Sequence, residues 1–247
     1  MLIELPIHNL IRLFKMASIG KLMGGLIHNL NGPLQNLGLD IEMAHHSLKS
    51  DSGLDNDLIN KISKRLNRME EEFDRIDQII KISSMKAIQD EDYHKPLHLN
   101  YFIQQELLFL QTNLYFKHNV RTELSFQDDL PPLVDLPGDF VLALSWFLQS
   151  VIEELESREI TSLTVQTSLN DSCVELITST EEEKLAEKFM GSLNKDISSS
   201  PNHKLEDNDV RMMLVLMVFK AGNVSIMSKD EPSGSQIILT IPINKEG

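Results

Sequence analysis

Two long helical repeats joined by a short turn constrain the fold of this chain more than any other feature of its sequence. Apolar residues recur at three- and four-residue spacing over 7–48, and a second series with nearly a seven-residue repeat covers about 55–85. The segment between them contains Gly53 and several helix-capping residues. Two long helices with so short a connection pack as an antiparallel hairpin. One hairpin cannot cover both series, which predicts a homodimer whose two hairpins form a four-helix bundle, although a coiled-coil spacer has the same pattern.

The spacing of apolar residues along the chain changes after Met85. A polar segment containing Pro96 follows, and short strand-like and helix-like stretches then alternate to the C-terminus. Strands are expected at 96–99, 120–126, 160–169, 172–180, 223–230 and 235–243, and helices at 101–116, 138–156, 181–193 and 209–221. Because several expected strands follow one another directly, the pattern favours helices packed on one sheet. The sequence therefore predicts an α+β protein with a helical hairpin domain at 1–88 and an α/β sandwich domain at 89–247.

The composition of the chain limits which partners it can bind and where in the cell it is expected. The formal net charge is −14, which repels phosphate backbones, so we expect no nucleic-acid partner. The single cysteine, Cys173, cannot form an internal disulfide bond and is typical of a reducing compartment. No apolar run has the length that a membrane span needs. We therefore expect a cytoplasmic protein.

One histidine in the first helix has unusual neighbours. Glycines in a helix interior cost roughly 1 kcal/mol each relative to alanine, and Pro33 removes a hydrogen bond to the carbonyl group of Asn29. No acidic residue occurs over 9–39, although the chain as a whole is acidic. A neutral imidazole can attack phosphorus, so these features are compatible with a nucleophile beside a phosphate-bearing partner, and an ordinary surface histidine remains the alternative. By helical spacing, the face of His28 also carries Lys21, Gly24, Gly25, Asn31, Gly32 and Gln35.

The stretch GKLMGGLIHNLNGPLQ resembles the histidine box of sensor histidine kinases. The residues in matching positions are His28, Leu30, Asn31, Pro33 and Leu34. The resemblance implies that His28 accepts a phosphoryl group and that the hairpin dimerises. More faintly, 131–157 is similar to the segment that leads into the asparagine-containing helix of a Bergerat-type ATP-binding domain.

The chain departs from the kinase pattern in the histidine box. Asn29 stands where autokinases usually have an acidic general base, and an amide cannot take up a proton. Gly32 stands where phosphatase-competent members have Thr or Asn.

Further departures affect the nucleotide site that the resemblance implies. Alignment places Ser150 at the magnesium-binding asparagine, and Trp146, one turn earlier, is not an asparagine either. The glycine loops expected near 179–189 and 203–214 contain no glycine and carry acidic residues. These losses predict no bound nucleotide and no ATP-dependent autokinase activity.

The combination resembles histidine phosphotransferases, which have a kinase-like dimeric bundle and a degenerate second domain. We expect His28 to relay phosphoryl groups between response-regulator receiver domains in two-component signalling, docking them through the residues on its face. The receiver would supply the magnesium ion, so no cofactor of the chain's own is expected. The pairs His45–His46 and His94/His98 have no convincing third ligand, so no metal site is expected. A non-catalytic pseudokinase scaffold, an atypical sensor kinase and a purely structural helical dimer remain alternatives.

Overall fold

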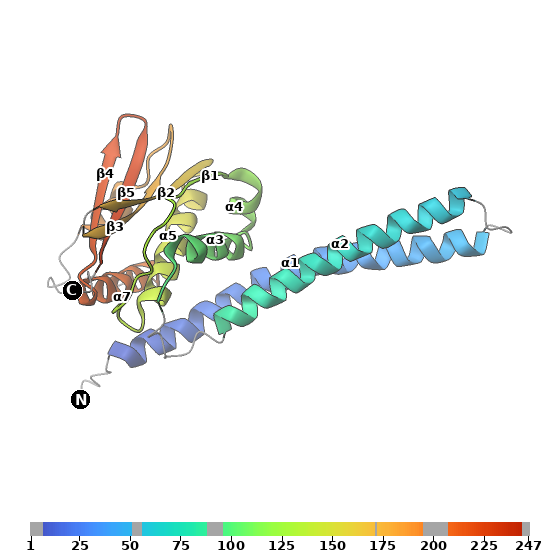
Figure 1. Cartoon of the computed structure of the whole chain (residues 1–247), viewed down its shortest axis with the longest axis horizontal. Coiled ribbons are helices and arrows are strands. Elements are labelled where there is room, and N and C mark those ends of the chain that lie inside the picture. Colours follow the sequence, from blue (N-terminus) through green and yellow to red (C-terminus); the bar gives the residue numbers. More distant parts are fainter. Residues whose placement is uncertain (1–6, 51–55, 88–95, 171, 195–206, 244–247) are drawn as a thin grey trace. The chain divides into compact units, whose positions relative to one another are not determined.

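The computed structural model describes residues 7–50, 56–87, 96–170, 172–194 and 207–243 (Figure 1). The chain divides into two compact units, Met1–Gln89 and Asp90–Gly247. The first unit is helical, and the second combines helices with a sheet.

The first unit consists of two long helices that lie along each other in opposite directions. Helix α1 spans Ile7–Ser50 and helix α2 spans Asn56–Ala87. Contacts join Asn36 to Glu72 and Asp40 to Arg65, so positions later in α1 meet positions earlier in α2. Pro33 lies inside α1, which continues through it. At 1.5 Å per residue the 44 residues of α1 extend about 66 Å.

The second unit is a mixed sheet with helices on one face. The sheet has five strands in the order β1-β2-β3-β5-β4; β1 runs parallel to β2, and the other neighbours are antiparallel. Figure 1 shows α3, α5 and α7 together on one side of the sheet. The elements are α3 (Leu99–Leu110), α4 (Leu114–Asn119), β1 (Arg121–Ser125), α5 (Phe140–Ser157), β2 (Ser162–Asn170), β3 (Cys173–Ser179), α6 (Glu187–Leu193), α7 (Asp207–Ala221), β4 (Ser225–Glu231) and β5 (Gly234–Pro242).

The core lies between the sheet and α5 and α7. Alternate residues of β2, β3 and β5 are buried, as expected for strands with one covered face. The ring of Phe219 in α7 lies 5.7 Å from the ring of Phe140 and 6.2 Å from that of Phe147, both in α5. These three side chains are at most 1% exposed. The α+β class with a sheet is therefore confirmed.

Three expected elements differ from the structure. The stretch 96–99 contributes only an isolated bridge between Leu97 and Leu133. The helix expected at 101–116 is two helices, because the side chain of Asn113 accepts a hydrogen bond from the Phe116 amide (2.8 Å) and starts a new helix. The helix expected at 181–193 begins only at Glu187.

The late start of α6 has a tertiary cause. The Leu185 amide donates to Ser235 Oγ (3.1 Å), and the Glu182 amide donates to the Ser233 carbonyl group. Thr180 Oγ1 in turn accepts from the Ser235 amide (3.0 Å). Bonds to the β4–β5 turn thus hold 181–186 out of a helix.

We expect Gly234→Ala to destabilise the second unit strongly. A Cβ atom at residue 234 would lie 1.9 Å from the Thr180 carbonyl oxygen, so the β4–β5 turn would have to move away from β3. A cost of about 3 kcal/mol or more is expected, measured by urea denaturation. The matched control is Gly191→Ala in α6, where nothing lies within 4 Å of the added atom. That control is expected to be neutral or stabilising, and equal midpoints for the two variants would contradict this account.

Candidate functional site

The residues predicted to form the site all belong to helix α1. His28, Lys21, Gly24 and Gly25 lie within its bounds, but their side chains are outside the described residues. Asn31, Gly32 and Gln35 are exposed. Nothing lies within 4 Å of a Cβ atom built on Gly32, so no contact within the described part of the chain requires a glycine there.

The apolar residues of each long helix fall into two series, each with a seven-residue repeat. One series in each helix faces the other helix: Leu37 is buried, and Leu30 and Ala44 are half-buried, as are Ile62, Met69 and Ile76 in α2. The other series is about half exposed or more in each helix, and it consists of Ile27, Leu34, Ile41 and Leu48 in α1 and Ile59, Leu66, Phe73 and Ile80 in α2.

The two exposed series occupy equivalent heptad positions. Ile41 immediately follows the inward-facing Asp40, and Leu66 immediately follows the inward-facing Arg65. In an antiparallel pair of helices, such positions flank the interface on the same side. The hairpin therefore has a wide apolar face that its own two helices do not cover.

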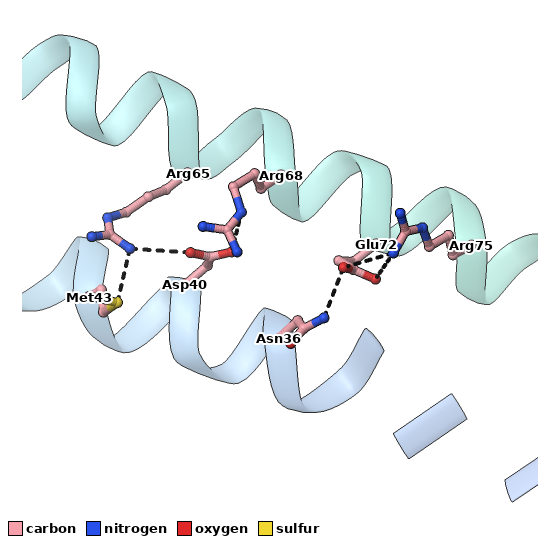
Figure 2. A network of polar contacts seen from close by, with 7 residues as sticks. All are labelled: Asn36, Asp40, Met43, Arg65, Arg68, Glu72 and Arg75. Carbon is pink, nitrogen blue, oxygen red and sulfur yellow. Dashed lines mark hydrogen bonds and ion pairs between the residues drawn. The ribbon is translucent and has the colours of Figure 1, made fainter. Parts of the chain in front are cut away.

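A layer of charged residues interrupts the interface between α1 and α2 (Figure 2). Asp40 is 2% exposed, and its Oδ1 accepts a hydrogen bond from Arg65 Nη1 (3.2 Å). Its Oδ2 lies 3.5 Å from Arg68 Nε, an ion pair that forms no hydrogen bond. Arg65 Nη1 also contacts Met43 Sδ at 3.1 Å. One carboxylate is thus held between two guanidinium groups inside the hairpin.

A second carboxylate lies further along the same interface. Glu72 is buried, and its Oε1 accepts a hydrogen bond from Asn36 Nδ2 (3.0 Å). Arg75 Nη1 donates to both oxygens of Glu72 at 3.3 and 3.4 Å. The prediction from sequence included neither Asp40 nor Glu72. They lie at seven-residue spacing from positions 33, 47 and 65, but those positions carry Pro, Ser and Arg, so the sequence has no apolar signal that could have identified them.

In the second unit, the positions that alignment gave to magnesium binding lie in the core. Trp146 is 3% exposed and Ser150 is 7% exposed, both on α5. Ser150 Oγ has no hydrogen-bond partner among the described residues. Residues 181–184, where a glycine loop was expected, are exposed. The second such segment, 203–214, is described only from residue 207 onward.

The ends of α5 and of the loop before α6 carry converging carboxylates. Burial raises the pKa of the Tyr115 hydroxyl group, and the carboxylates of Glu159, Glu183 and Glu156 raise it further. Asn113 Nδ2 donates to Glu156 Oε2 (2.6 Å), and Tyr115 Oη donates to the Ile160 carbonyl group (3.2 Å). Three carboxylates therefore lie near the Tyr115 hydroxyl group.

Other buried polar groups join the helices that cover the sheet. Ser145 Oγ in α5 donates to Glu106 Oε1 in α3 (2.7 Å), and both residues are buried. Arg211 Nη1 in α7 lies 2.9 Å from Glu153 Oε2 in α5. Because these pairs link α3, α5 and α7 to one another, we interpret them as structural.

In the described part of the chain, no group of three or more His, Cys, Asp or Glu side chains could hold a metal ion. No described helix combines the length and the apolar character that crossing a membrane requires.

The chain is similar to solved structures of histidine kinases and of a phosphotransferase. With the histidine kinase AdeS of Acinetobacter baumannii it shares 14% identity over 88% of this chain and 98% of that chain, with a TM-score of 0.42. With a bacterial phosphotransferase it shares 10% identity over 91% and 95%, with a TM-score of 0.45. With the catalytic domain of the histidine kinase ThkA it shares 12% identity over 60% and 94%, with a TM-score of 0.46.

No protein family model matches the sequence, and no curated protein matches it either. Similarity to solved structures at this level assigns no activity to the chain.

Proposed function

We propose that this protein is a homodimeric histidine phosphotransfer protein of two-component signalling. His28 accepts a phosphoryl group from the phosphorylated aspartate of one response-regulator receiver and passes it to another. The observation that carries the proposal is the segment around His28, with its histidine-box residues and its absence of acidic side chains over 9–39.

The heptad pattern of α1 supports an outward position for the nucleophile. Gln35 and Glu42 lie seven and fourteen residues after His28, and both are exposed. Continuing this series back by one repeat predicts that residue 28 also faces away from α2, where a receiver could dock. Gly32 leaves room for that approach, because no described side chain fills the space beside it.

The proposed step transfers one phosphoryl group between two proteins. A neutral imidazole nitrogen of His28 attacks phosphorus, an N–P bond forms, and the bond from phosphorus to the receiver's aspartate oxygen breaks. The aspartate leaves as a carboxylate, and the receiver supplies the magnesium ion that offsets the charge of the phosphoryl oxygens. The task of this chain is to position the imidazole.

Homodimerisation is supported by the apolar face of the hairpin. The eight residues of the two exposed series are each 49 to 61% exposed in a single chain. Packing two such faces together would cover them and give the four-helix bundle.

We further propose that the second unit does not use ATP. Ser150 and Trp146 are buried where a magnesium ligand would be needed, and exposed glutamates replace a glycine loop. The three consecutive glutamates at 181–183 would repel a triphosphate.

We therefore expect no thermal shift with millimolar Mg-ATP, measured by scanning fluorimetry on the full chain. A ligand at a hundredfold excess over its dissociation constant stabilises a fold by about 2.7 kcal/mol, which is readily detected. A clear shift that disappears without magnesium would contradict this part of the proposal and favour an atypical sensor kinase.

A further inference from the structure

The apolar layers of the hairpin do not determine how α1 and α2 are aligned along their axes. Leu37 and Ala44 in α1, and Ile62 and Met69 in α2, each repeat at seven residues within the interface. A slide of one helix by seven residues, about 10 Å, would replace each apolar side chain by another. Apolar packing alone therefore permits several alignments.

The charged layer distinguishes these alignments. The contacts of Asn36 with Glu72 and of Met43 with Arg65 correspond to one alignment, in which Asp40 meets Arg65 and Arg68. A seven-residue slide in one direction would replace Arg65 by Glu72, another carboxylate, and Arg68 by Arg75. A slide in the other direction would replace Arg65 by Leu58, which carries no charge, and Arg68 by Lys61.

Only the observed alignment gives the buried carboxylate its hydrogen bond from Arg65. After either slide its only cation would be Arg75 or Lys61, at the position that the largely exposed Arg68 now holds. A buried charge without a partner is strongly unfavourable, whereas apolar replacement of a complete buried ion pair is often tolerated. Specifying an alignment is the best-attested use of such buried polar groups.

We propose that Asp40 is a positioning residue that, together with Arg65 and Arg68, fixes the axial alignment of α1 against α2. It thereby fixes the axial position of His28 relative to α2. The importance of that position for phosphotransfer rests on the proposed function. A seven-residue slide would move His28 by about 10 Å relative to α2, and a receiver docked on both helices could no longer reach it.

Disulfide trapping in the full chain tests the alignment directly. In a Cys173→Ser background, Ala44→Cys with Ile62→Cys reports the observed alignment. Leu37→Cys with Ile62→Cys reports the slide that brings residue 40 opposite Leu58. Disulfide bonds need Cα atoms within about 7 Å, so each pair reports one alignment. Intramolecular and intermolecular products separate by mass on denaturing gels.

We expect the parent chain to form the 44–62 bond and little of the 37–62 bond. Asp40→Leu combined with Arg65→Leu should increase the 37–62 bond roughly tenfold, because the charge that opposed the slide is gone. Asp40→Asn should also raise the yield of the 37–62 bond, but to a smaller extent. Asp40→Glu keeps the charge and should behave as the parent does.

Both outcomes of the trapping experiment are decisive. If the double-leucine and Asp40→Asn chains retain parental helicity and the parental bond pattern, the proposal is wrong. If the double-leucine chain does not fold, Asp40→Asn decides by itself. The experiment uses no receiver and no phosphate, so its result does not depend on whether His28 transfers phosphate. Conversely, phosphotransfer could persist even if Asp40 had no effect on the alignment.

Discussion

Replacing Leu66 and Phe73 by glutamate is expected to convert the proposed dimer into monomers while the hairpin stays folded. Both side chains belong to the exposed series of α2, at 50% and 61% exposure, so they contribute little to packing within one chain. Burying each in a dimer stabilises it by roughly 1.5–3 kcal/mol. Two substitutions in each of two chains therefore remove on the order of 6 kcal/mol, or about four orders of magnitude in the dissociation constant.

Sedimentation velocity at micromolar concentration measures this change, and circular dichroism checks that the helices persist. The matched control is Asn60→Glu with Asn67→Glu, which adds the same charges at exposed positions one residue after Ile59 and Leu66. The control should remain dimeric. A monomeric parent chain, or a glutamate variant as dimeric as its control, would refute the proposed bundle.

His28→Gln is expected to abolish labelling by a phosphorylated receiver. Without the imidazole no nitrogen nucleophile is positioned at this site, so transfer should fall by at least about a thousandfold. The dimer should be unaffected, because the proposed interface uses the exposed apolar series and not residue 28. Gly32→Leu keeps the nucleophile, residue 32 is exposed and nothing lies within 4 Å of an added Cβ atom, so this variant should reduce labelling by obstructing the receiver.

Radiolabel transfer within minutes of mixing measures both variants. If His28→Gln accepts label as well as the parent chain does, another residue is the nucleophile. If neither chain accepts label from any receiver but both bind one tightly, the protein is a non-catalytic scaffold.

Much of the secondary structure could be predicted from the sequence, because its patterns are long and regular. The series over 7–48 and 55–85 locate α1 and α2 to within about two residues at each end. The alternation of apolar and polar residues likewise locates β2, β3 and β5 closely, because each of these strands buries one face.

Errors arose where contacts distant in sequence decide the local structure. The Ser235 hydroxyl group accepts a hydrogen bond from the Leu185 amide, across fifty residues, and delays the start of α6. In the sequence, Asn113 looks like an ordinary polar residue within a helical pattern. In the structure its side chain caps the start of α4. Neither interaction has a signature in the periodicity of its own segment.

The candidate site was only partly predictable for a related reason. Two apolar series lie side by side on each helix, and periodicity cannot tell that Ile62 and Met69 face α1 whereas Leu66 and Phe73 are exposed. Asp40 resembles a surface charge in the sequence. Its role depends on which residues of α2 lie opposite it, which only the structure supplies.

The central claim is that His28 carries a phosphoryl group in transit. The most direct measurement is a two-step transfer, in which a labelled receiver is mixed with the chain, the labelled chain is purified, and a second, unlabelled receiver is added. We predict a label on the peptide containing His28 that is labile in acid and stable in base, and that then moves to the second receiver. A label that never reaches the chain, resides on another residue, or does not leave for any receiver would contradict the account.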